Sequence, residues 1–87
     1  KFVKLFSDSA DGWQNIGIGN MLQKKFSSAI APLRKTIELT PDNGTAYYNL
    51  AICYLNIQDR NNAVELYKKL KDIDPNLANR LLEILSR

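Results

Sequence analysis

Residues 47 to 75, which read YYNLAICYLNIQDRNNAVELYKKLKDIDP, repeat the pattern of residues 13 to 41, which read WQNIGIGNMLQKKFSSAIAPLRKTIELTP. Their first residues, Trp13 and Tyr47, lie 34 positions apart, and other large, small and proline positions recur at the same offset. The matched pairs are Ile16 with Leu50, Gly17 with Ala51, Ala29 with Ala63, Leu33 with Tyr67 and Pro41 with Pro75, whereas Ile37 and Lys71 do not match. Each position has its own role in packing or turning, so a common offset indicates an internal structural repeat.

The apolar spacing within each copy is helical rather than alternating. Tyr47, Leu50, Ala51 and Tyr54 stand at i, i+3, i+4 and i+7, and Trp13, Ile16, Gly17 and Asn20 are their counterparts in the first copy. This spacing places each set on one face of a helix, and a second helix follows in each copy. Each copy is therefore predicted to be a helical hairpin. We predict five helices and no sheet, at approximately residues 10 to 23, 27 to 39, 44 to 57, 61 to 73 and 77 to 86.

Short polar breaks separate these helices. Within the copies, Ser27 and Asn61 stand one period apart and are the predicted N-caps of the second helices. Between the copies, a proline disfavours continuation of the preceding helix, and Asp42 or Asn76 is the predicted cap of the next one. Pro32 is expected to lie inside a helix and to forfeit one backbone hydrogen bond near Ser28.

Composition excludes several classes of function. The chain has 87 residues, enough for one domain with a modest core but not for a deep, enclosed catalytic pocket. It contains no histidine, the commonest general base and metal ligand, and the single Cys53 leaves neither an intrachain disulfide nor a cysteine-rich zinc site. We therefore expect no catalysis, no metal and no cofactor. A net charge of +3 is too mild to predict a nucleic-acid partner, and no apolar run approaches the roughly 18 to 20 residues of a membrane span.

The repeated residues resemble the motif of the tetratricopeptide repeat family, in which aromatic, small and large apolar residues precede a proline. The second copy matches the motif at Tyr47, Leu50, Ala51, Tyr54, Ala63, Tyr67 and Pro75. The first copy departs from it at Asn20, where the family has an aromatic residue, and at Thr36, where it has a small one, so we expect looser packing there. The resemblance implies an all-α fold, a short right-handed solenoid of stacked antiparallel hairpins. Its parts would be residues 1–9 as an N-terminal arm or the remnant of a preceding repeat, residues 10–43 and 44–77 as the two repeats, and residues 78–87 as a capping helix.

The resemblance also implies a place for a ligand, because the first helices of such hairpins line a concave groove. An apolar stripe runs along the predicted first helices, and the candidate groove residues are Ile18, Met21, Leu22, Tyr48, Asn49, Ile52, Leu55 and Leu82. Such a groove would hold an extended peptide or a partner helix. The alternative is that successive first helices, or the N-terminal arm, bury these residues by internal packing.

The charged residues do not predict a specific binding site. Some family members grip acidic C-terminal tails with Lys, Asn and Arg, but here Gln14, Ile18, Asn79 and Glu83 occupy most of the corresponding places, and only Asn49 is compatible. An acidic-tail clamp is therefore not expected. The basic residues Arg34, Lys35, Lys68, Lys69 and Lys71 fall on the second helices. We interpret them as a solvated outer surface, with a patch for an acidic partner or nucleic acid as the lesser alternative.

These observations predict a non-catalytic protein-interaction module that takes a protein or peptide ligand. The alternative is structural: self-assembly into a homo-oligomer through the N-terminal end of the stack or through the groove. A cytoplasmic location is expected, because the free thiol of Cys53 suits a reducing compartment.

Overall fold

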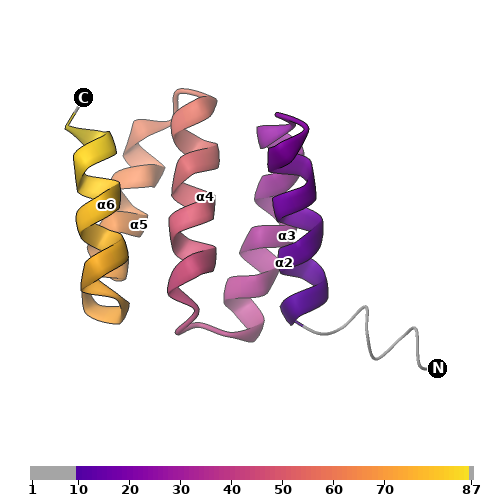
Figure 1. The fold of residues 1–87 in the computed structure, drawn as a ribbon, viewed down its shortest axis with the longest axis horizontal. Coiled ribbons are helices and arrows are strands. Elements are labelled where there is room, and N and C mark those ends of the chain that lie inside the picture. Colours follow the sequence, from indigo (N-terminus) through magenta and orange to yellow (C-terminus); the bar gives the residue numbers. More distant parts are fainter. Residues whose placement is uncertain (1–9, 87) are drawn as a thin grey trace.

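The computed structural model describes residues 10 to 86, which form five helices and, within that range, no strand (Figure 1). The helices are α2 (Ala10–Leu22), α3 (Phe26–Leu39), α4 (Gly44–Asn56), α5 (Arg60–Ile73) and α6 (Pro75–Leu85). The all-α prediction is confirmed, and the helices lie within two residues of their predicted bounds, with the largest difference at the start of α6. The predicted N-terminal arm, residues 1–9, lies outside the described residues, as does Arg87.

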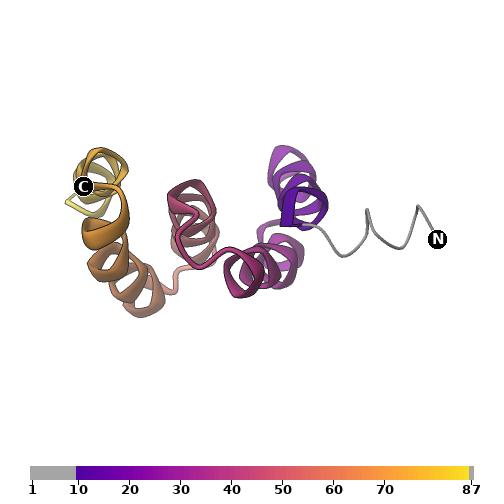
Figure 2. The same cartoon turned by 90° about the horizontal axis from the view of Figure 1, so that it is seen from below.

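The helices alternate between two layers (Figure 2). Each packs against the next, because loops of one to four residues leave no alternative to an antiparallel turn. The first helices α2, α4 and α6 form one layer, and the second helices α3 and α5 form the other. In Figure 2, α2 and α6 flank α4 and lie higher in the view than α3 and α5, so the first helices form the inside of a shallow curve. We call their exposed side the inner face.

The hydrophobic core consists of two adjoining clusters. One lies among α4, α5 and α6 and contains Tyr47, Ala51, Ala63, Leu70, Ala78, Leu81 and Leu85. The other joins the two hairpins and contains Ala29 and Leu33 from α3 and Leu50 and Cys53 from α4. Ile37, Tyr54 and Leu66 are half-buried and pack against both clusters. The three residues therefore connect the stacking of one hairpin on the next with the core of the second hairpin.

Helix α6 packs against both α4 and α5. Leu81 and Leu85 are buried in the α4–α6 cluster, and the guanidinium of Arg60 at the start of α5 donates a hydrogen bond to the carbonyl of Leu85. The helix begins at Pro75, whose missing N–H costs nothing in the first helical turn.

Small residues let the helices of each hairpin approach closely, as the repeat register predicts. Ala29 and Ala63 are fully buried. At Gly17, an added Cβ would lie 2.6 Å from Cγ and 2.7 Å from Cδ2 of Leu33, which is itself fully buried. At Gly19, two positions further along α2, an added Cβ would have no atom within 4 Å. The two glycines therefore have different roles in one helix.

The predicted N-caps were wrong by one or two residues. The residues that occupy the N-cap positions are Lys25, Asn43, Asp59 and Asp74, in place of Ser27, Asp42, Asn61 and Asn76. Three of these caps accept backbone hydrogen bonds through their side chains, for example Asn43 Oδ1 from the N–H of Ala46 at 3.2 Å. Lys24 follows α2 and Gln58 follows α4, and both have a left-handed backbone, with φ of 61° and 64° respectively. This conformation ends the first helix of each hairpin, and the second helix begins two residues later. These two positions also stand one repeat apart.

Asn20 and Thr36, the two residues of the first copy that depart from the motif, both donate side-chain hydrogen bonds to backbone carbonyls. Pro32 lies inside α3 and has no N–H, so the carbonyl of Ser28 lacks its usual helical donor. The side-chain amide of Asn20 on α2 donates to that carbonyl at 3.3 Å. Thr36 is fully buried, and its hydroxyl donates to the carbonyl of Pro32 at 3.0 Å. The polar residue at position 20 is thus matched to the proline on the neighbouring helix.

Ile16 corrects the predicted core of the first copy. Its side chain is 53% exposed, whereas Leu50, its partner in the register, is 2% exposed. Leu50 is buried because α3, the helix before α4, supplies Ala29 and Leu33. No described helix precedes α2, so nothing equivalent covers Ile16 in residues 10 to 86.

We predict opposite effects of alanine at the two glycines of α2. Gly17→Ala should lower the free energy of unfolding by about 1 kcal/mol, because overpacking against Leu33 outweighs the better helix propensity of alanine. Gly19→Ala should raise it by about 0.5 to 1 kcal/mol, because only the propensity changes. Urea unfolding followed by circular dichroism measures both, and effects of the same sign would contradict the close approach.

We also predict that Asn20 and Pro32 are energetically coupled. Asn20→Ala should cost about 0.5 to 1 kcal/mol in the wild-type background, because the carbonyl of Ser28 loses its donor. In a Pro32→Ala background, the N–H of the new alanine supplies that donor, so the same change should cost less. A double-mutant cycle of unfolding free energies tests this, and simple additivity would show that the hydrogen bond contributes nothing.

Candidate functional site

The predicted groove residues all lie on the layer of first helices. Ile18, Met21 and Leu22 come from α2, Tyr48, Asn49, Ile52 and Leu55 from α4, and Leu82 from α6. The first helices pack against one another and against the second layer, since α4 contacts both α2 and α6 as well as the second helices. The candidate residues are therefore distributed over all three first helices.

Burial differs along this stripe. Tyr48, Ile52 and Leu55 are half-buried and pack against the α4–α6 cluster. Ile18, Met21 and Asn49 are also half-buried, and Met21 packs against the cluster that joins the hairpins. Leu22 and Leu82, at the two ends, are 80% and 42% exposed. The middle of the stripe thus contributes to internal packing while keeping part of its apolar surface open, and the ends are open to solvent.

The positions of an acidic-tail clamp carry no basic side chain. Gln14 contributes to the structure instead, because its Oε1 accepts a hydrogen bond of 2.7 Å from Nδ2 of Asn43 in the turn between α3 and α4. Ile18 is half-buried, and Asn79 and Glu83 are exposed on α6. This set of side chains comprises one apolar residue, two amides and one carboxylate, and none of them is cationic.

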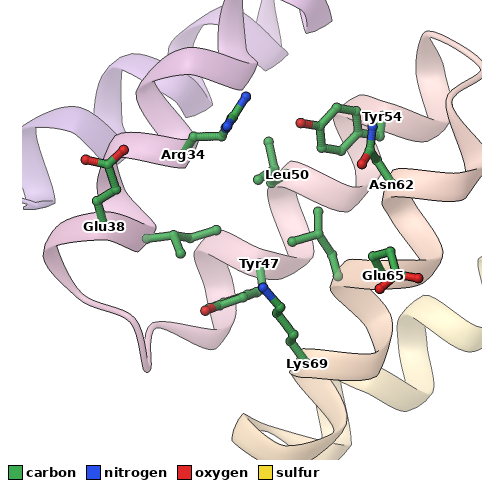
Figure 3. A pocket seen from close by; sticks show the side chains of 10 residues that line it. Arg34, Glu38, Tyr47, Leu50, Tyr54, Asn62, Glu65 and Lys69 are labelled. Atoms are coloured by element: carbon green, nitrogen blue, oxygen red, sulfur yellow. The ribbon is translucent and has the colours of Figure 1, made fainter.

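A pocket that sequence reasoning missed lies on the other layer, between α3 and α5 (Figure 3). We call it the outer pocket, and its volume is about 400 Å³. Its lining residues are Arg34, Ile37 and Glu38 from α3, Tyr47, Leu50 and Tyr54 from α4, and Asn62, Glu65, Leu66 and Lys69 from α5. The pocket exists because α3 and α5 each pack on α4 but not on one another within the described chain. The periodicity of each helix contains no signal for the distance between the two.

Charged residues surround the outer pocket unevenly. Glu38 pairs with Lys35 at 3.6 Å, and Glu65 pairs with Lys68 at 3.5 Å, both as exposed pairs one helical turn apart. The ammonium of Lys71 lies 5.8 Å from the ring centroid of Tyr67.

Arg34 and Lys69 form no ion pair with any of residues 10 to 86. They project from opposite walls of the pocket, one from each second helix (Figure 3). Of the six basic residues on the second helices, these two line the pocket.

Cys53 is a packing residue. Its thiol is fully buried in the cluster that joins the hairpins, and burial raises the pKa of that thiol from 9.0 to about 11. The thiol is therefore neutral near neutral pH, as a small apolar core group. Residues 10 to 86 contain no cluster of side chains suited to a metal ion, and none of the described helices is both long and apolar enough to span a membrane.

Comparison with known proteins agrees with the repeat register. The model of the tetratricopeptide repeat family matches residues 20–85 and confirms the resemblance derived from the repeated positions. The chain is also similar to the BBSome complex member BBS4 homolog of Drosophila melanogaster, with 44% identity over 46 residues. That match covers 53% of this chain and 10% of the relative, so the chain corresponds to a small part of that protein's length.

The buried thiol leads to a prediction about pH. Because the pKa of Cys53 is higher in the folded chain than its ordinary value of 9.0, the folded state holds this proton more tightly. The resulting stabilisation is present below pH 9 and is lost as the pH rises from 9 to about 11. In unfolding measurements across this range, the wild-type protein should lose more stability than Cys53→Ala. Parallel pH profiles would contradict the assignment.

Proposed function

Because the chain belongs to the tetratricopeptide repeat family, we propose that it is a non-catalytic protein-interaction module that binds an extended peptide or a partner helix along its inner face. Repeat modules of stacked helices offer continuous surfaces of this kind, and a partner that lays apolar side chains on them removes those surfaces from water. The partner in this proposal is a protein.

The observation that carries the proposal is the apolar stripe on α2, α4 and α6. Leu22 and Leu82 stay open at its ends, and Tyr48, Ile52 and Leu55 keep part of their surface exposed between them. The half-buried residues are held by the core, so their positions are set before a partner arrives. A preformed apolar surface loses little conformational entropy on binding, which favours affinity.

The relative suggests what kind of partner this would be. Its name describes a member of a multi-subunit complex, and we propose that the inner face of this chain likewise contacts another subunit of an assembly. We also propose a cytoplasmic location, on the ground that the thiol of Cys53 is free and buried rather than engaged in a disulfide.

A second candidate function is self-assembly through the N-terminal end of the stack, and Ile16 favours it. The register makes Ile16 the counterpart of Leu50, which packs under the preceding helix, yet Ile16 is 53% exposed. A second copy of the chain that placed a helix against α2 would bury this side chain. Sedimentation velocity at increasing protein concentration tests this candidate. A mass that rises with concentration and returns to the monomer value in Ile16→Lys supports it, and a constant monomer mass contradicts it.

We predict that Leu82→Glu weakens peptide binding at the inner face by at least tenfold. A carboxylate in the apolar stripe must stay hydrated or lose its charge when a partner covers it. The fold should persist, because Leu82 is 42% exposed. Ile52→Glu should weaken binding as well. Because Ile52 also packs on the core, the helical content of this variant must be checked by circular dichroism. Peptides selected from a random library on the wild-type protein serve as ligands, with affinity measured by fluorescence anisotropy.

Leu39→Glu is the matched control for this measurement. Leu39 is 43% exposed, nearly the same as Leu82, but it lies on α3 in the other layer. Its replacement should leave binding unchanged. If the selected peptides bind the Leu82 and Leu39 variants equally well, the inner face is not the binding site.

A further inference from the structure

The outer pocket has an apolar floor that the core holds in place. Tyr47 and Leu50 line the pocket and are core residues of different clusters. Ile37 and Leu66 extend the apolar surface up the α3 and α5 walls and pack against both clusters. A cavity whose floor is part of two cores is preformed, and its volume of about 400 Å³ suits an inserted side chain with its flanking backbone.

The rim of the pocket carries two cations and two carboxylates. Glu38 and Glu65 have lysine partners on their own helices, whereas Arg34 and Lys69 have no carboxylate partner in residues 10 to 86. These two cations come from opposite walls, so together they flank the apolar floor (Figure 3). A ligand that complements this arrangement carries an apolar group between negative charges. Guanidinium and ammonium groups both form charge-assisted hydrogen bonds with carboxylates.

We propose that the outer pocket binds a short acidic peptide segment, which places one apolar side chain on the Tyr47 and Leu50 floor and carboxylates beside Arg34 and Lys69. This site lies on the layer opposite the inner face and is independent of the function proposed above. The apolar floor favours a peptide over a nucleic acid, because an inserted apolar side chain covers that floor whereas a phosphate chain does not.

The test uses the full chain and a fluorescein-labelled peptide in which one phenylalanine is flanked on both sides by aspartates. Anisotropy titrations should show saturable binding that weakens as salt rises. Arg34→Gln and Lys69→Gln should each weaken it by about threefold to tenfold. Arg80→Gln is the matched control, because Arg80 is an exposed cation on α6 that does not line the pocket. It removes the same charge and should have no effect.

Two further peptides distinguish the contribution of the aspartate charges from that of the inserted phenylalanine. Replacing each aspartate by asparagine should abolish the salt dependence and weaken binding, and replacing the phenylalanine by alanine should weaken it at every salt concentration. Backbone amide shifts in a ¹⁵N-labelled sample should change around Ile37 and Leu66 and stay constant around Ile52 on the inner face.

Several results would overturn the proposal. Absence of saturable binding would do so, as would equal loss in Arg34→Gln and Arg80→Gln, which indicates general charge attraction. Amide shifts confined to the inner face would assign the peptide to the other site. Displacement of the peptide by a single-stranded oligothymidylate at lower concentration than by unlabelled peptide would identify the basic residues as a nucleic-acid surface.

Discussion

The close approach of the two helices in each hairpin is the constraint on which the rest of the structure depends. Gly17 permits it in the first hairpin, where the side chain of Leu33 occupies the space that a Cβ would need. Ala51 and Ala63 do the same in the second hairpin, and both are fully buried. Leu33 packs against Gly17 and also belongs to the cluster that joins the two hairpins. The core therefore forms between hairpins as well as within them.

This arrangement produces two different surfaces from one packing scheme. Helix α4 contacts the other two first helices and both second helices, so its residues support both the inner face and the outer pocket. Tyr48 and Ile52 pack against the α4–α6 cluster, while Tyr47 and Leu50 form the floor between α3 and α5. The outer pocket is open because the second helices separate on the outside of the curve, whereas the first helices contact one another on the inside. A change that alters the packing of α4 should affect both surfaces.

Departures from the repeat motif prove informative when residues on neighbouring helices are considered together. Asn20 alone looks like a defect, since the second copy has Tyr54 at that position. Its amide donates to the carbonyl that Pro32 leaves without a helical donor in α3, so Asn20 compensates for the proline on the neighbouring helix. The sequence contained both residues, and it also indicated that Pro32 would leave a backbone group unpaired near Ser28. What it could not indicate was that the side chain at position 20 reaches that group across the hairpin.

The sequence by itself determined the five helices, their order, the hairpin register and the small residues at the crossings, because those depend on local periodicity and on an offset of 34 residues. It also placed the candidate stripe on the first helices. Only the tertiary structure decided that Ile16 is exposed while its counterpart Leu50 is buried, because burial depends on which helix lies alongside. The outer pocket was likewise decided only by the tertiary structure. Its walls come from three helices, and the space between α3 and α5 is set by how the hairpins pack on α4, which no single stretch of sequence encodes.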